Sequence, residues 1–133
     1  MDSVPTYEIR FSPKLKSCSM PQRDLLYLRH MLDAVERIRR YLDGVGLEDF
    51  EADEVLQDAV IRQLEILGEA ASRVDQEYRS SNPQIPWSKA ISTRNRLIHG
   101  YLSVDMEIVY RTATHHVPRL RLSLEQAVDD LGH

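Results

Sequence analysis

The feature that most constrains the fold is a helical period of apolar residues that begins after Pro21. Apolar side chains recur there at steps of three or four, at Leu25, Leu28, Leu32, Val35, Ile38 and Leu42. This spacing places all six on one face of an α-helix. Gly44 and Gly46 follow directly and predict its end, because glycine is favoured just after a helical C-terminus.

A second segment repeats the same period. Its apolar stripe consists of Leu56, Val60, Leu64, Leu67, Ala71, Val74 and Tyr78. Ile61 and Ile66 widen the apolar surface beyond this stripe, which is typical of a central helix or a subunit interface. Gly68 stands in mid-helix, where glycine costs about 1 kcal/mol relative to alanine, and a close approach of another helix would explain it. The breaker cluster at residues 80–83 predicts that the helix ends before it.

A third helical segment follows Pro86, which suits a first helical turn because no N–H is required there. The side chains expected to face inward are Trp87, Ile91, Ile98 and Leu97. Arg94 shares their stripe, and a guanidinium turned inward needs a carboxylate, a carbonyl or a bound phosphate as its partner. Gly100 is expected to end the helix, and Ser103 or Asp105 to cap the next one.

Pro118 lies inside the last helical segment, and a proline in a helix interior breaks or kinks it. We therefore expect one helix from about Met106 to His115 and another from about Val117 to Leu131. A chain of 133 residues is long enough for a single core. Together the segments predict one all-α domain over residues 21–133, folded as an antiparallel bundle of four to five helices.

The first 20 residues contain two prolines and show no sustained period, so we expect a mobile arm, with a short strand at residues 7–11 as an alternative. A translation start at Met20 is also conceivable. No apolar run approaches the roughly 20 residues that span a bilayer, and the start lacks the apolar centre of a signal peptide. The single cysteine, Cys18, excludes an internal disulfide, so a reducing cytoplasm is the expected compartment.

The charge of the chain is unevenly distributed. A net charge of −4 argues against a generic nucleic-acid binder, which is usually basic. Residues 88–121 nevertheless carry six basic residues against two acids, a surplus of +4 that leaves −8 for the remainder. Residues 43–58 hold seven acids and no base, and we interpret them as a solvated loop and helix start.

The basic surplus coincides with the sequence RNRLIHGY at residues 94–101, which brings together groups suited to phosphate chemistry. Arg94 can hold a phosphate in two-point geometry, His99 can transfer a proton near neutral pH, and Tyr101 carries a modifiable hydroxyl. Such a set suits metal-free RNA cleavage. His99 would take the proton of a ribose 2′-OH or protonate the leaving 5′-oxygen, and Arg94 would stabilise the charge on the phosphate.

The spacing of Arg94, His99 and Tyr101 sets a geometric condition for a shared site. Arg94 and Tyr101 share a helical face, whereas His99 is about 140° away from Arg94. The chain must therefore leave the helix at His99 and Gly100 for all three to meet. A two-fold dimer could supply a second proton-transfer group by joining two copies of the motif, and Asn95 could orient the histidine or bind the phosphate.

A purely structural role for the motif is the competing interpretation. Arg94 would then pair with Glu69 or Glu65, and His99 would be a helix C-terminal residue stabilised by the macrodipole. In a catalytic site Glu69 would instead orient Arg94. His115 and His116 point about 100° apart on a helix and have no carboxylate at metal-ligand spacing, so we expect no metal site.

Residues 94–101 closely resemble the signature of the HEPN superfamily, and the tyrosine two residues after the histidine resembles its HepT-like branch. The likeness extends in the same order to RDLLYLRHMLDAVERI at 23–38, AVIRQLEILGEAA at 59–71, and IPW with the motif and VD at 85–105. It covers roughly residues 21–131 and leaves the N-terminal arm outside.

The resemblance implies a helical HEPN fold and a homodimer whose two motifs face a shared cleft. It implies metal-independent RNase activity with Arg94 and His99 as the catalytic pair, without a cofactor, on a tRNA or an mRNA. It also implies a toxin–antitoxin pair in which an MNT-type nucleotidyltransferase antitoxin attaches AMP to Tyr101. A bulky anion there would occupy the phosphate site and repel RNA.

Two other functions remain open from the sequence. One is a catalytically silent HEPN module that binds a nucleotide or serves as the partner of a nucleotidyltransferase. The other is a helical dimerisation module whose motif is structural. The intact Arg94 and His99 favour the ribonuclease.

Overall fold

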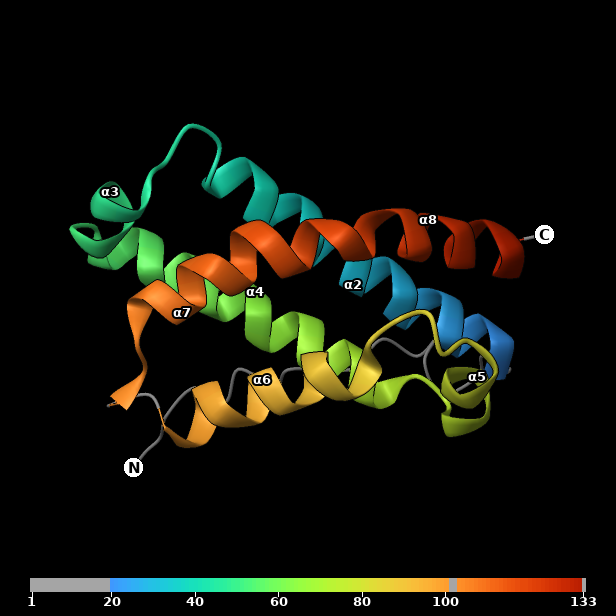
Figure 1. Ribbon diagram of the computed structural model, residues 1–133. Coiled ribbons are helices and arrows are strands. Elements are labelled where there is room, and N and C mark those ends of the chain that lie inside the picture. Colours follow the sequence, from blue (N-terminus) through green and yellow to red (C-terminus); the bar gives the residue numbers. More distant parts are fainter. Residues whose placement is uncertain (1–19, 101–102, 133) are drawn as a thin grey trace, which may run out of the picture.

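A computed structural model describes residues 20–100 and 103–132, and within these ranges every regular element is helical. The four longest helices are α2 (Met20–Tyr41), α4 (Glu54–Arg73), α6 (Trp87–His99) and α8 (Leu120–Leu131). Figure 1 shows that successive members of this set run antiparallel. The short helices α3 (Leu47–Glu51), α5 (Gln76–Ser81) and α7 (Met106–Arg111) lie between them. The predicted all-α antiparallel bundle is therefore confirmed.

Several sequence-based expectations fall outside the described residues. These are the mobile arm and the alternative strand at residues 7–11, the environment of Cys18, and the position of Tyr101. Among the helices that are described, none is both long and apolar enough to cross a bilayer.

Helix α4 is the central element, because it packs against α2 on one side and against α6 on the other, while α2 also packs against α8 (Figure 1). The core positions of α4 are those of the predicted stripe, with Val60, Leu64, Leu67 and Ala71 buried. The first stripe buries Leu28, Val35 and Ile38 on α2 and Leu42 directly after it. Periodicity thus predicted both the helices and the faces that they bury.

The contact between α4 and α6 depends on Gly68. A Cβ atom added to Gly68 would lie 2.3 Å from Cβ of Arg94 and 2.6 Å from the carbonyl oxygen of Ala90. Real Cβ atoms do not approach other heavy atoms so closely. The expectation that another helix comes close at this glycine is confirmed, and the neighbouring helix is the one that carries Arg94.

The second helical segment ends earlier than its period predicts. Helix α4 stops at Arg73, because Val74 is extended (ψ 138°) and the Asp75 side chain accepts a hydrogen bond from the Glu77 N–H to start α5. The buried carboxylate of Asp24, on α2, accepts the Asp75 N–H at 2.9 Å. A single helix through Tyr78 was therefore wrong, because a residue far away in the sequence binds the backbone at the break.

The remaining helix ends follow the sequence more closely. Gly44 has φ +72°, the left-handed conformation that favours glycine after a helix. Asp105 caps α7 by accepting a hydrogen bond from the Glu107 N–H at 2.9 Å. The division near Pro118 is confirmed, although the chain stays helical there.

The division near Pro118 takes the form of two irregular turns. A π-helical turn over Thr112–His116 is followed by a 3₁₀ turn over Val117–Arg119. The Val117 N–H donates to the Thr112 carbonyl, five residues back. Proline supplies no N–H of its own, so this change of hydrogen-bond pattern lets the chain pass it without a break.

The acidic stretch is solvated and leads into the start of α4 as expected, but residues Leu47–Glu51 within it form the short helix α3 where a loop was expected. All seven acids between Asp43 and Asp58 are exposed, and Asp53 caps α4 by accepting the Leu56 N–H at 3.0 Å. Phe50 lies in the middle of this stretch but is fully buried, with its ring 5.5 Å from that of Tyr110.

Candidate active site

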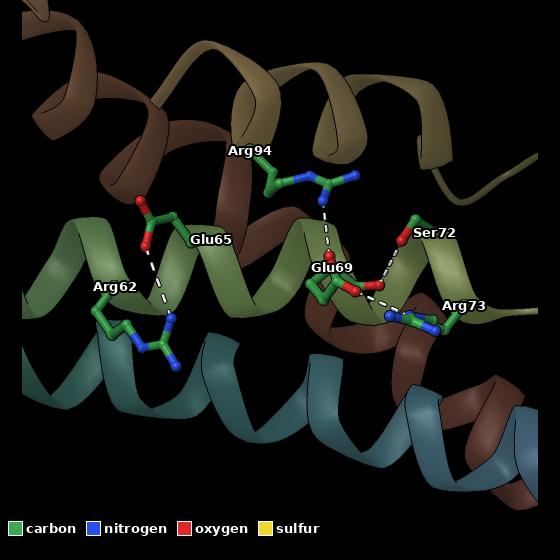
Figure 2. A network of polar contacts seen from close by, with 6 residues as sticks. All are labelled: Arg62, Glu65, Glu69, Ser72, Arg73 and Arg94. Atoms are coloured by element: carbon green, nitrogen blue, oxygen red, sulfur yellow. Dashed lines mark hydrogen bonds and ion pairs between the residues drawn. The ribbon is translucent and has the colours of Figure 1, made fainter. Parts of the chain in front are cut away.

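Arg94 of α6 reaches across to α4 and binds Glu69. Its Nη1 lies 2.6 Å from Oε1 of Glu69, and Figure 2 shows the guanidinium extending from α6 toward α4. The Arg94 side chain is only 21% exposed, so the pair is partly shielded from water. The sequence left both Glu69 and Glu65 open as partners. Glu69 is the partner, whereas Glu65 lies 3.8 Å from Arg62 (Figure 2).

Glu69 also binds a second arginine, on its own helix. Nε of Arg73 lies 2.8 Å from Oε2 of Glu69, so each carboxylate oxygen serves one guanidinium (Figure 2). This hydrogen bond raises the pKa of Arg73 above its ordinary value. The role of Arg73 was not predicted, although its spacing of four residues from Glu69 is a recognised ion-pair signal. The second pair fixes the carboxylate that holds Arg94.

Arg94 keeps hydrogen-bonding capacity beyond this ion pair. A guanidinium has five N–H donors, and the Nε of Arg94 is buried with no acceptor among the described residues. Arg94 and Glu69 also line an open hollow of about 710 Å³ between α2, α4 and α6. The arrangement thus places an oriented cation, with donors still unused, at the edge of a hollow large enough for a phosphate.

His99 is the last residue of α6 and is exposed. The following Gly100 ends the helix, and its N–H donates to the Arg96 carbonyl at 2.8 Å. His99 lines a separate hollow of about 520 Å³ between α6 and α7, which does not include Arg94. Asn95 is exposed, and its side chain makes no hydrogen bond with a described residue. Arg94 and His99 are therefore neighbours on one helix, but within one protomer they face different hollows.

One side chain of α6 points differently from the expectation. Ile98 was expected to face inward, but it is 46% exposed and lines the same open hollow as Arg94. Leu97 is buried and occupies the core position instead, together with Trp87 as expected. The prediction for Ile98 was wrong because Ile98 lies one turn beyond Arg94, on the side of α6 that borders the hollow.

No metal-binding arrangement is present among the described residues. Nowhere in residues 20–100 and 103–132 do three or more His, Cys, Asp or Glu side chains gather in a way that could hold a metal ion. The Nδ1 atom of His115 lies 3.0 Å from the Thr114 hydroxyl, and His116 borders a third hollow, between α4, α6 and the π-helical turn.

Comparison with known proteins supports the resemblance drawn from the motif. The family model described as "Ribonuclease HepT-like" matches residues 31–127, which include both Glu69 and the motif. A protein of Thermococcus cleftensis named "Probable ribonuclease HepT" is 35% identical over 100 residues, covering 75% of this chain and 91% of the relative.

Two further relatives are named as candidate RNases. One, from Caldanaerobacter subterraneus subsp. tengcongensis, is 34% identical over 75% of this chain and 89% of its own length. Another, from Methanocaldococcus jannaschii, is 32% identical over 84% of this chain and 97% of its own length. No solved structure matches the chain significantly. On the family match and these identities, the chain belongs to the ribonuclease HepT-like family of the HEPN superfamily.

Proposed function

We propose that this protein is a metal-independent RNA endonuclease that acts in the cytoplasm as the toxin of a toxin–antitoxin pair. The observation that supports this most directly is the position of Arg94, which Glu69 holds at 2.6 Å on a HepT-like helix that ends in His99. Phosphodiester cleavage without a metal requires a cation of fixed orientation and a proton-transfer group that act on the same phosphate.

The reaction uses the RNA's own nucleophile. The ribose 2′-oxygen attacks the adjacent phosphorus, the bond from phosphorus to the 5′-oxygen breaks, and a 2′,3′-cyclic phosphate forms. His99 takes the proton of the 2′-OH or delivers a proton to the leaving 5′-oxygen. Arg94 donates hydrogen bonds to the phosphate oxygens, on which negative charge accumulates. Asn95, one residue later on the exposed surface of α6, contributes a further hydrogen bond to the histidine or the phosphate.

A homodimer would resolve the separation of Arg94 and His99 within one protomer. The hollow that contains Arg94 is open, and Tyr27, Ile66 and Ile98 contribute apolar side chains to a lining that is otherwise mostly charged. Ile98 is 46% exposed there, which suits a surface covered by a second copy. Two-fold pairing over this surface brings two copies of the motif to one cleft, so that both proton transfers have a histidine.

The proposed control of this activity is covalent. An MNT-type nucleotidyltransferase antitoxin transfers AMP from ATP to Tyr101, whose hydroxyl oxygen forms a bond to the α-phosphorus while pyrophosphate leaves and the phenolic proton is lost. Tyr101 itself lies outside the described residues, two positions after His99. The added phosphate would compete with RNA for Arg94 and repel the RNA backbone.

The test is RNA cleavage in excess EDTA. Total tRNA and an mRNA transcript are incubated with wild-type protein, whose unmodified mass is confirmed, and with Arg94→Gln and His99→Ala. We expect cutting by wild type alone, leaving 2′,3′-cyclic or 3′-phosphate ends. Equal cutting by all three proteins would remove Arg94 and His99 from the mechanism.

If none of the three proteins cuts RNA, the alternative function is favoured. This is a catalytically silent HEPN module that binds a nucleotide or a nucleotidyltransferase partner. The net charge of −4 and the ion pair that already occupies part of Arg94 are the observations in its favour.

A further inference from the structure

The side of α6 opposite to Arg94 borders a second surface feature, which we call the α6–α7 groove. It consists of two adjoining hollows of about 260 and 520 Å³. Both are lined by Leu64, Thr93, Arg96 and Thr112, so they form one continuous depression between α6 on one side and α7 with the π-helical turn on the other. Lys89 and His116 line one end of the groove and His99 the other.

The groove contains cations that no carboxylate neutralises. Lys89 and Arg96 are exposed, and neither forms an ion pair or a side-chain hydrogen bond with any described residue. Many other arginines of the chain have an acidic partner three or four residues away, as Arg37 has in Asp33 and Arg111 in Glu107. The one acidic residue lining the groove is Asp105, whose carboxylate caps α7. The surface is therefore positive although the whole protein is acidic.

The spacing of these cations suits an extended polyanion. Lys89 and Arg96 are seven residues apart, so they share a helical face and lie about 10 Å apart along the axis. Arg94 and Arg96 are about 200° apart on the same helix, which turns Arg96 away from the ion pair with Glu69. The line from Lys89 through Arg96 ends at His99, the proposed proton-transfer group.

Hydroxyl groups complete the lining of the groove. The hydroxyls of Ser92 and Thr93 each donate to the Lys89 carbonyl, at 3.2 and 2.8 Å, which leaves their oxygens as acceptors. Thr112 belongs to the π-helical turn and has no side-chain hydrogen bond with a described residue. Such turns occur frequently at functional sites, and this one supplies both Thr112 and His116 to the groove. Acceptors of this kind can bind the ribose 2′-OH.

We propose that the α6–α7 groove binds the single RNA strand that leads to the scissile phosphate, with Lys89 and Arg96 each contacting a backbone phosphate. This inference rests on the proposed ribonuclease function and adds a substrate path to it. The groove binds the backbone rather than the bases, because its exposed lysine and arginine bind phosphates, which carry no sequence information. It explains how an acidic protein retains a polyanionic substrate, since two exposed cations without an acidic partner among the described residues line the groove that ends at His99.

The test compares two double variants that remove the same charge. Lys89→Gln/Arg96→Gln changes the groove, and Arg29→Gln/Arg40→Gln changes two exposed arginines of α2 that have no ion pair with a described residue and line neither hollow. Each is combined with His99→Ala so that RNA is not cut. Binding of a fluorescein-labelled single-stranded RNA is measured by anisotropy from 50 to 300 mM salt.

We expect the groove variant to bind on the order of tenfold more weakly at 0.1 M salt. The slope of log K against log salt concentration should decrease in magnitude by about 1.4, because each of the two lost phosphate contacts contributes about 0.7. The α2 variant should keep the slope of the His99→Ala parent. With His99 restored, the groove variant should show a higher KM and an unchanged kcat. Equal affinity and slope in the two double variants would overturn the proposal, as would a lower melting temperature that accounts for the loss.

The experiments distinguish a wrong groove proposal from a wrong ribonuclease function. If wild type cuts RNA in EDTA but the groove variant binds like the α2 variant, the groove proposal is wrong and the function stands. If wild type does not cut but the groove variant alone loses binding, the groove is an RNA site on a protein without nuclease activity.

Discussion

Gly68 offers the sharpest test of how the fold positions the candidate site. Replacing it with alanine adds one methyl group at the contact between α4 and α6. That methyl would lie 2.3 Å from Cβ of Arg94 and 2.6 Å from the Ala90 carbonyl oxygen. Neither atom is the end of a flexible side chain, so the strain is relieved only when the helix α6 moves.

The size of the movement follows from these distances. Ordinary contact begins at 3.4 Å, so α6 must retreat by about 1.1 Å at this point, the difference between 3.4 and 2.3 Å. The same displacement along the ion pair would lengthen the 2.6 Å contact between Arg94 and Glu69 to about 3.7 Å, beyond hydrogen-bonding range. Overpacking costs about 1–3 kcal/mol. The higher helix propensity of alanine than of glycine offsets this by about 1 kcal/mol, so we expect a net loss of stability of about 0–2 kcal/mol.

The assay separates stability from positioning. Urea unfolding gives the free energy of unfolding, and RNA cleavage in EDTA at a temperature where the variant is fully folded gives kcat/KM. We expect kcat/KM of Gly68→Ala to fall by ten- to a hundredfold, because a misplacement of 1 Å at a catalytic group costs about that much. Gly46→Ala is the matched control, since its added methyl meets nothing within 4 Å and its φ is −85°.

Two results would refute this reasoning. A Gly68→Ala protein more stable than wild type by about 1 kcal/mol would show that helix preference alone decides the outcome and that the close approach imposes no strain. Undiminished cleavage by a folded Gly68→Ala protein would show that the position of Arg94 against Glu69 is not needed for activity.

Three further predictions concern single side chains. Glu69→Ala should lower the free energy of unfolding in urea by about 1–3 kcal/mol, because it leaves the partly buried Arg94 without its acceptor. Arg73→Ala should lower it by under about 1 kcal/mol, because the Arg73 side chain is 61% exposed. His99→Ala should abolish cleavage in EDTA with a melting temperature within about 2 °C of wild type, since His99 is exposed and has no side-chain hydrogen bond or ion pair with a described residue. A drop of several degrees would favour a structural role. Burial raises the pKa of Asp24 above 3.8, and the hydrogen bond from the Asp75 N–H opposes this rise in part. The folded state therefore binds the Asp24 proton more tightly than the unfolded state, so stability falls as pH rises through the raised pKa. Asp24→Asn should remove this loss of stability with rising pH, which is measured by urea unfolding at about pH 4 and pH 7. The same pH dependence of stability in both proteins would contradict a raised pKa at Asp24.

The sequence alone determined the local features of this protein. The apolar period over residues 25–42 and 56–78 predicts two helices and their buried faces, because a helix in a bundle must bury one stripe, although the second helix ends at Arg73. A close approach at Gly68, a cap at Ser103 or Asp105 and an interruption at Pro118 could be predicted, because each residue type has a known effect on the backbone. The π-helical and 3₁₀ turns that form this interruption were not predicted. The motif and its surroundings were also enough to indicate the family, which the family model confirms.

Tertiary structure decided the features that depend on distant residues. Glu65 and Glu69 lie one turn apart on α4, and only the crossing of α4 and α6 at Gly68 selects Glu69 as the partner of Arg94. The period through Tyr78 could not reveal the helix end at Arg73, because the Asp24 carboxylate that binds the Asp75 N–H lies 51 residues away. The apolar period of a helix predicts which face is buried, but it does not specify which other helix that face packs against, because packing between elements decides this.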